Sequence, residues 1–210
     1  MADREKVYIF WDNSNIFIPA QGVANQKEGA LTGREIRIQF DNLFDLAKAG
    51  RDVAQGVCTG SVPPELERVW ARLRSTGIAV ELYERGAGSG KEQGVDQCLQ
   101  VHMLRALADA PAPSVAVLMT GDGAGYMSGA GFHADLERMA KRGWGIEVLS
   151  WDIACNGRLR DWAKAAGVYI PLEDFYDSIT FREGIRRSTN VSLTHRHRAK
   201  GTHLCSVEYL

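Results

Sequence analysis

Apolar residues along this chain fall into short continuous runs separated by longer segments with a helical rhythm. The runs are rich in valine, isoleucine and aromatic residues, which is typical of strands. Because they are apolar throughout instead of alternating with polar residues, they predict strands that are buried on both faces of a sheet. The predicted strands are Val7–Trp11, Val53–Cys58, Ala79–Tyr83, Val115–Thr120, Ile146–Ser150 and Val168–Ile170.

The segments between the runs repeat apolar residues at the spacing of an amphipathic helix. Pro63-Pro64 suits the start of one helix, and Gly143 and Gly167 suit the ends of two others. Strands that alternate with helices in this way predict an α/β fold with a mostly parallel sheet covered by helices. The predicted helices run over Ile36–Ala47, Leu66–Leu73, Val95–Ala108, Phe132–Met139 and Leu159–Ala166.

Composition places the chain among soluble proteins. Of its 210 residues, 45% are hydrophobic and 24% are charged, as in an ordinary globular domain. No apolar run reaches the roughly 18 residues of a membrane span, so we expect no contact with a membrane. The charged N-terminus lacks the apolar segment of a signal peptide, which favours a cytoplasmic location.

The C-terminal part differs in charge from the rest. Residues 178–210 hold six basic and two acidic residues, a formal charge of +4, whereas the remainder carries −5. Helical and strand periodicity fades near residue 182. We therefore predict one domain over residues 1–181 and a basic C-terminal tail over residues 182–210, which is compatible with a nucleic acid partner.

The cysteines and one histidine have plain structural interpretations. Cys58, Cys98 and Cys155 lie in apolar segments, and none of the four cysteines forms a C-x-x-C pair. We interpret them as reduced, mostly buried thiols. His102 lies in an apolar helical segment and is interpreted as a packed core histidine.

Three aspartates occupy positions where side chains of an α/β fold meet ligands. Asp12 and Asp122 each follow a predicted strand, and Asp96 opens a predicted helix. Because strand ends and helix starts share one edge of a parallel sheet, we expect the three carboxylates to converge. Clustered carboxylates favour a divalent cation such as Mg²⁺ or Mn²⁺. Structural roles are also open: a helix cap for Asp12, a dipole partner for Asp96 and a turn residue for Asp122.

The glycine-rich stretches do not match known phosphate loops. In the segment 85–91, Arg85 stands where a P-loop needs its first glycine, and Glu92 follows Lys91 where Ser or Thr is needed. The segment 121–125 lacks the third glycine of the dinucleotide-binding motif. Both stretches are therefore interpreted as loops at the strand ends.

Three short motifs together resemble the NYN domain, a branch of the PIN-like nucleases. They are Asp12-Asn13-Ser14-Asn15 after a strand, Gly94-Val95-Asp96 opening a helix, and Thr120-Gly121-Asp122 closing a strand. The resemblance spans about residues 6 to 180. It implies a Rossmann-like three-layer α/β/α (PIN-like) fold and an Mg²⁺- or Mn²⁺-dependent ribonuclease. It also implies that the catalytic, metal-binding carboxylates are Asp12, Asp96 and Asp122, with Asn13 and Asn15 as polar companions.

One feature departs from the pattern of the family. Its members commonly carry a further aspartate in the form G-D-x-D-F, but this chain has Gly121-Asp122-Gly123-Ala124-Gly125-Tyr126. Asp135 and Asp152 are the candidates for the missing carboxylate. We favour Asp152 as a further metal ligand because it follows a predicted strand at the same edge of the sheet.

The predicted function is hydrolysis of RNA phosphodiester bonds. Asn13, Ser14, Asn15 and Lys91 are the expected contacts to the RNA, and the oligomeric state is open. A first alternative is an RNA- or protein-binding module of weak or absent activity on the same fold. A second is an aspartyl phosphotransferase with Asp12 as nucleophile, which ranks lower because such enzymes usually present D-x-D after the first strand.

Overall fold

The computed structural model describes residues 6–61, 67–75, 77–83, 95–111, 113–189 and 198–200. Six parallel strands form the central sheet in the order β4-β3-β1-β5-β6-β7. Counted along the chain within this sheet, the order is 3-2-1-4-5-6, that of the doubly wound Rossmann fold. The strands are β1 (Lys6–Asp12), β3 (Asp52–Ser61), β4 (Ala79–Tyr83), β5 (Val115–Met119), β6 (Gly145–Ser150) and β7 (Val168–Pro171).

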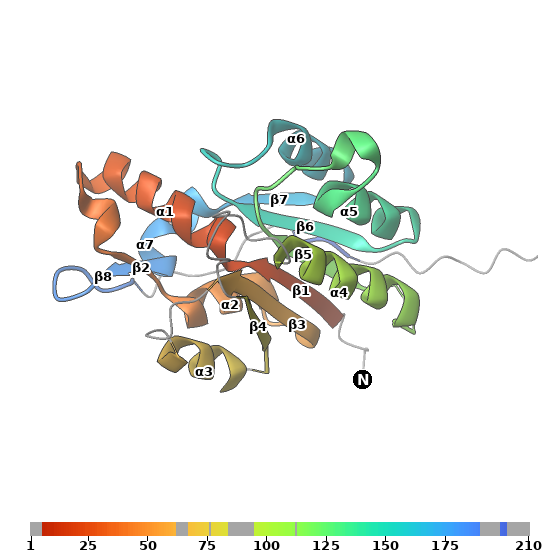
Figure 1. Ribbon diagram of the computed structural model, residues 1–210, viewed down its shortest axis with the longest axis horizontal. Helices are drawn as coiled ribbons and strands as arrows, with labels where there is room; N and C mark the ends of the chain where they lie inside the picture. Colours follow the sequence, from red (N-terminus) through yellow and green to blue (C-terminus); the bar gives the residue numbers. More distant parts are fainter. Residues whose placement is uncertain are drawn as a thin grey trace, which may run out of the picture.

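Helices cover both faces of the sheet and make three layers (Figure 1). Phe10 and Trp11 are both fully buried in β1, and because they are neighbours in a strand they point into opposite cores. The Trp11 side is covered by α1 (Asn13–Glu28), α2 (Phe40–Lys48), α3 (Glu67–Ser75) and α7 (Tyr176–Ile179). The Phe10 side is covered by α4 (Val95–Asp109), α5 (Gly131–Lys141) and α6 (Gly157–Ala166).

The structure confirms the predicted α/β fold and its parallel sheet. Each of the six predicted strands coincides with a strand of the sheet, although β3 extends three residues beyond Cys58, to Ser61, and β5 ends at Met119, one residue before the predicted end at Thr120. Short 3₁₀ helices complete the connections: η1 (Thr32–Arg34), η3 (Tyr126–Ser128) and η4 (Leu172–Phe175). None of the described helices is long and apolar enough to cross a membrane.

The predicted helix over Ile36–Ala47 is wrong at its start. Residues 36–38 form β2 (Ile36–Ile38), which pairs antiparallel with β8 (Thr180–Arg182) in a separate small sheet. Ile36 and Ile38 are buried and Arg37 between them is exposed, a period of two that marks a strand. Because the pairing partner comes from a distant part of the chain, local helical spacing did not reveal it.

Helix α1 is absent from the predicted helices. Its apolar residues do not gather on one strong stripe, and Pro19 lies inside it, so its sequence lacks the usual helical signals. The Asp12 side chain caps its first turn by accepting a hydrogen bond from the Asn15 backbone N–H, at 3.2 Å. The end of β1 therefore runs directly into a helix.

Described residues beyond position 181 contact the rest of the fold. Arg182 and Arg186 both bind the Glu28 carboxylate of α1, at 3.2 and 2.9 Å. Arg198 lies 2.9 Å from the buried Glu147 of β6. The predicted division at residues 181 and 182 stays a prediction.

Candidate functional site

The candidate site lies where the strand order reverses, between β1 and β5. Trp11 of β1 pairs with Met119 of β5, so Asp12 and Thr120 meet just beyond the last paired residues. The Thr120 hydroxyl donates to Asp12 Oδ2 at 3.3 Å and accepts from the Asp122 backbone N–H at 3.2 Å. In open α/β sheets this reversal point is where ligands bind. The structure thus links Asp12 to the Asp122 turn through a single threonine.

The Asp12 carboxylate is buried and firmly held. Its side chain is at the end of β1, in a residue only 1% exposed, and it accepts bonds from the backbone and the side-chain amide of Asn15. On the neighbouring strand, burial and the negative charge of Asp12 raise the pKa of the Cys58 thiol. The helix-cap role considered for Asp12 is therefore confirmed. Asp12 also lies at the carboxyl edge of the sheet, where ligands bind in this kind of fold.

Polar residues of the first turn of α1 border Asp12. Asn13 packs over Gly60 of β3, where an added Cβ would stand 3.3 Å from the Asn13 Cβ. Asn13 Oδ1 is a buried acceptor without a hydrogen-bond partner in the part of the chain that the structure describes. Ser14 and Asn15 are half-buried in the same turn. Lys91, the other predicted RNA contact, lies outside the described residues.

Asp122 and Asp96 reach the same edge from two further elements. Asp122 is half-buried, and its Oδ1 accepts from the Ala124 backbone N–H at 2.9 Å, which is the turn role considered for it. Asp96 lies in the first turn of α4, which packs against β1 and β3. Since Asp12 is two residues beyond Phe10, it belongs to the sheet face that α4 covers.

The spacing of these groups limits how they could hold an ion. In the described part of the chain, Asp12, Asp96 and Asp122 do not form a group whose ligand atoms all lie within 4.8 Å of one another. The donor atoms of the three aspartates are all oxygens, which suits a hard cation. Mg²⁺ keeps several waters and needs only one or two carboxylates. The residues fit a hydrated Mg²⁺ or Mn²⁺ better than an ion bound directly by three aspartates.

The two candidates for a fourth carboxylate have different surroundings. Asp152 follows β6 at the carboxyl edge, is exposed, and accepts from the Tyr169 hydroxyl at 2.8 Å. Asp135 is buried in α5, where Arg138 pairs with it at 2.8 Å. Burial raises the pKa of Asp135 in spite of that arginine. Asp152 therefore remains the more accessible of the two.

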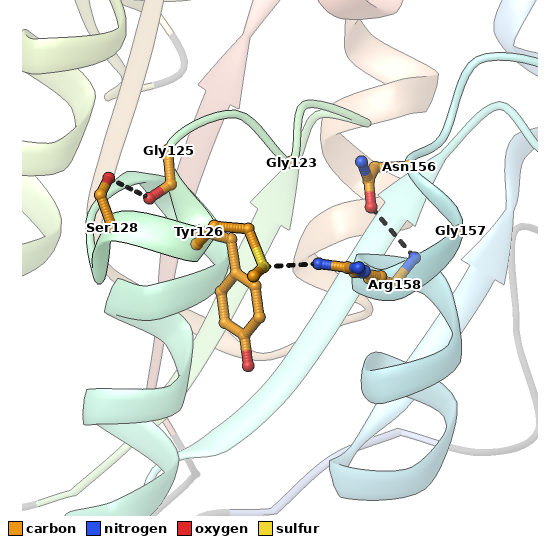
Figure 2. A pocket seen from close by; sticks show the side chains of 8 residues that line it. Gly123, Gly125, Tyr126, Ser128, Asn156, Gly157 and Arg158 are labelled. Carbon is orange, nitrogen blue, oxygen red and sulfur yellow. Dashed lines mark hydrogen bonds between the residues drawn. The ribbon is translucent and has the colours of Figure 1, made fainter.

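A pocket of about 530 Å³ opens beside Asp122. Figure 2 shows Asn156 and Arg158, at the start of α6, facing the loop that carries Tyr126. A Cβ at Gly123 would collide with Asn156, so glycine is what allows the two loops to approach. Sequence reasoning missed this pocket, although Asn156-Gly157 before a helix is a recognisable cap signal. Its lining residues are Gly123, Gly125, Tyr126, Met127, Ser128, Asn156, Gly157 and Arg158.

Comparisons with known proteins bear on the family and the fold of the chain. A family model described as the NYN domain matches residues 6–173. No curated protein matches the chain. Among solved structures, a protein of unknown function from Vibrio parahaemolyticus RIMD 2210633 is similar with a TM-score of 0.58 and 16% sequence identity, over 83% of this chain and 96% of that one. At this identity, the likeness shows the fold alone.

Proposed function

Because the chain belongs to the NYN domain family, which is generally nuclease-like, we propose that the protein is a metal-dependent ribonuclease that hydrolyses phosphodiester bonds in RNA. The observation that carries the proposal is the link from Asp12 through Thr120 to the Asp122 turn at the reversal point of the sheet. This link holds acidic side chains at the edge of the sheet where ligands bind in open α/β folds.

The proposed catalytic carboxylates would also hold the metal. Asp12, Asp96 and Asp122 would bind Mg²⁺ or Mn²⁺ partly through water, with Asp152 as the candidate for a further ligand. Such an ion supplies an activated water and offsets negative charge on the phosphate oxygens.

The protein's own residues orient these groups and the substrate. Asn15 and Thr120 hold the two oxygens of Asp12 in place, so the carboxylate is preorganised. Asn13 and Ser14 would hydrogen-bond the phosphate from the first turn of α1, and Lys91 would contact a neighbouring phosphate. Arg158 would add positive charge in the adjoining pocket.

Replacement of Asp12 by asparagine tests the proposal. Asparagine caps helices as well as aspartate does, so Asp12→Asn removes the charge and keeps the start of α1. We expect the rate of cleavage of labelled RNA in Mn²⁺ to fall at least about 100-fold. That is the upper end of the loss seen when a residue that only supports a metal ligand is changed, and a residue that binds the metal itself should matter at least as much.

The matched control is Asp52→Asn, which makes the same change in an exposed residue. Asp52 is the first residue of β3, at the edge of the sheet opposite the candidate site. It should leave cleavage unchanged. Cleavage by purified Asp12→Asn at the wild-type rate would refute the catalytic assignment.

A second candidate function is RNA binding without cleavage on the same fold. The Asp122 carboxylate is engaged in its own turn, and the G-D-x-D-F aspartate is missing from the chain. Both features weaken a metal site without removing the pocket next to it. Wild-type protein that binds RNA in gel-shift assays but does not cleave it in Mn²⁺ or Mg²⁺ would favour this function.

A further inference from the structure

A cluster with a different donor set joins α4 to the edge strand β4. Glu81 of β4 faces Cys98 and His102, which lie four residues apart on one face of α4. Cys98 Sγ and His102 Nε2 each lie 2.7 Å from a separate oxygen of Glu81. One ligand atom from each residue lies within 4.8 Å of the others, and this is the one such group of three among the described residues.

The chemistry of these donors selects a class of metal. A thiolate, an imidazole and a carboxylate suit Zn²⁺ and related transition metals, whereas Mg²⁺ and Mn²⁺ prefer oxygen alone. With a neutral imidazole, a dipositive ion would balance the charges of the thiolate and the carboxylate. A neutral set of this kind reduces the cost of placing charges in a half-buried site.

The surroundings suit metal entry and orient the histidine. The Glu81 side chain is 37% exposed and that of His102 is 16% exposed, so an ion can reach the cluster from solvent. Gln55 of β3 lies on the far side of the ring, with its side-chain nitrogen 3.1 Å from His102 Nδ1. A metal on Nε2 would leave the ring proton on Nδ1, and the Gln55 amide could turn its oxygen to accept it.

We propose that Glu81, Cys98 and His102 form a binding site for Zn²⁺ or a similar transition metal, distinct from the proposed catalytic carboxylates. The ion replaces the thiol proton of Cys98, which goes to solvent, and water completes a tetrahedral shell. Zinc bond lengths place ligand atoms about 3.3–3.6 Å apart, so the three side chains open slightly around the ion. The site holds the first turns of α4, which include Asp96, on the edge strand.

Cobalt spectroscopy on the whole chain tests the site in the absence of RNA. Co²⁺ bound to a thiolate gives charge-transfer absorption, and zinc should displace it. We expect the thiolate band of the wild type to saturate at one thiolate-bound Co²⁺ per chain, the band to be lost in Cys98→Ser, and this Co²⁺ to bind at least tenfold more weakly in His102→Gln. Zinc should also raise the melting temperature of the wild type, and Cys98→Ser should lose that rise.

Two controls separate this site from other thiols and from the nuclease proposal. Cys155→Ser changes a half-buried thiol on the loop before α6 and should keep the full signal. Asp12→Asn should also keep it, whatever happens to RNA cleavage. A wild type without thiolate absorption, or a Cys98→Ser variant that retains it, would overturn the assignment.

Discussion

Arg158 brings a positive charge to the pocket beside Asp122. It lies in the first turn of α6, behind the Asn156 cap, and its side chain is exposed. Its guanidinium contacts the Met127 sulfur at 2.6 Å. Because methionine is uncharged, this neighbour does not compensate the positive charge of Arg158. A guanidinium at a helix start is well suited to an RNA phosphate.

Arg158→Ala should therefore weaken RNA binding and its dependence on salt. Loss of one phosphate contact reduces the slope of log K against log salt by about 0.7 for single-stranded RNA. The measurement is a titration of labelled RNA at several KCl concentrations without divalent metal, which prevents cleavage.

Arg142→Ala is the control, because Arg142 is exposed at the end of α5, at the opposite edge of the sheet. Equal salt slopes for Arg158→Ala and the wild type would show that Arg158 does not contact a phosphate.

At the scale of elements, α5 is tied to the loop before it by an aromatic stack. The His133 ring stacks on the Tyr126 ring, with 3.9 Å between the ring centroids. The Trp162 ring of α6 also contacts His133, with 4.9 Å between the centroids. His133 is 2% exposed, and neither ring nitrogen has a hydrogen-bond partner within the described residues. Burial lowers the pKa of His133, and Glu137 only partly opposes this. The fold therefore favours the neutral ring.

The stability of this region should depend on pH through His133. Its pKa in the folded protein lies below the ordinary value of 6.5, so the unfolded chain takes up the proton first as pH falls. The contribution of the neutral ring is fully present above pH 6.5 and is lost progressively as pH falls from that value through the lower pKa of the folded protein. Urea unfolding between pH 8 and pH 5.5 should show the decline in the wild type.

His133→Phe keeps an aromatic ring against Tyr126 and cannot take up a proton. The free energy of unfolding of this variant should fall less on acidification than that of the wild type. Parallel pH profiles for the two proteins would contradict the role of His133.

At the scale of the whole molecule, Glu147 joins three distant segments. Its side chain is fully buried in β6, and Arg51, just after α2, binds both of its oxygens at 2.9 Å. Arg198 pairs with it at 2.9 Å and the Ala199 backbone N–H donates to it at 2.9 Å. Burial lowers the pKa of Arg198 to about 10, although Glu147 opposes the change. The carboxylate thus compensates two arginines in the interior.

Glu147→Ala should destabilise the protein more than a surface change does. Removal of one partner from a buried ion pair leaves uncompensated charge and typically costs about 3–5 kcal/mol. The free energy of unfolding in urea measures this, with the exposed Glu183→Ala as control. A loss below about 1 kcal/mol, the range of surface pairs, would mean that the arginines find other compensation.

Much of the fold could be predicted because buried strands and amphipathic helices carry local signals. Strand β5 reads as an uninterrupted apolar run, and α6 ends at Gly167 as its sequence indicates. The exceptions have physical causes. Helix α1 contains Pro19 and has no strong apolar stripe, and β2 depends on pairing with β8, far along the chain.

The pattern of apolar runs is enough to predict which residues end the parallel strands, and therefore that Asp12, Asp122 and the first turn of α4 lie at one edge of the sheet. That follows because strand direction and chain order decide the edge without any knowledge of side-chain positions. The contacts between side chains follow instead from the folded arrangement: Thr120 lies between Asp12 and the Asp122 turn, and Glu81 meets Cys98 and His102. Such contacts depend on strand order, register and packing between distant segments, which local patterns do not encode.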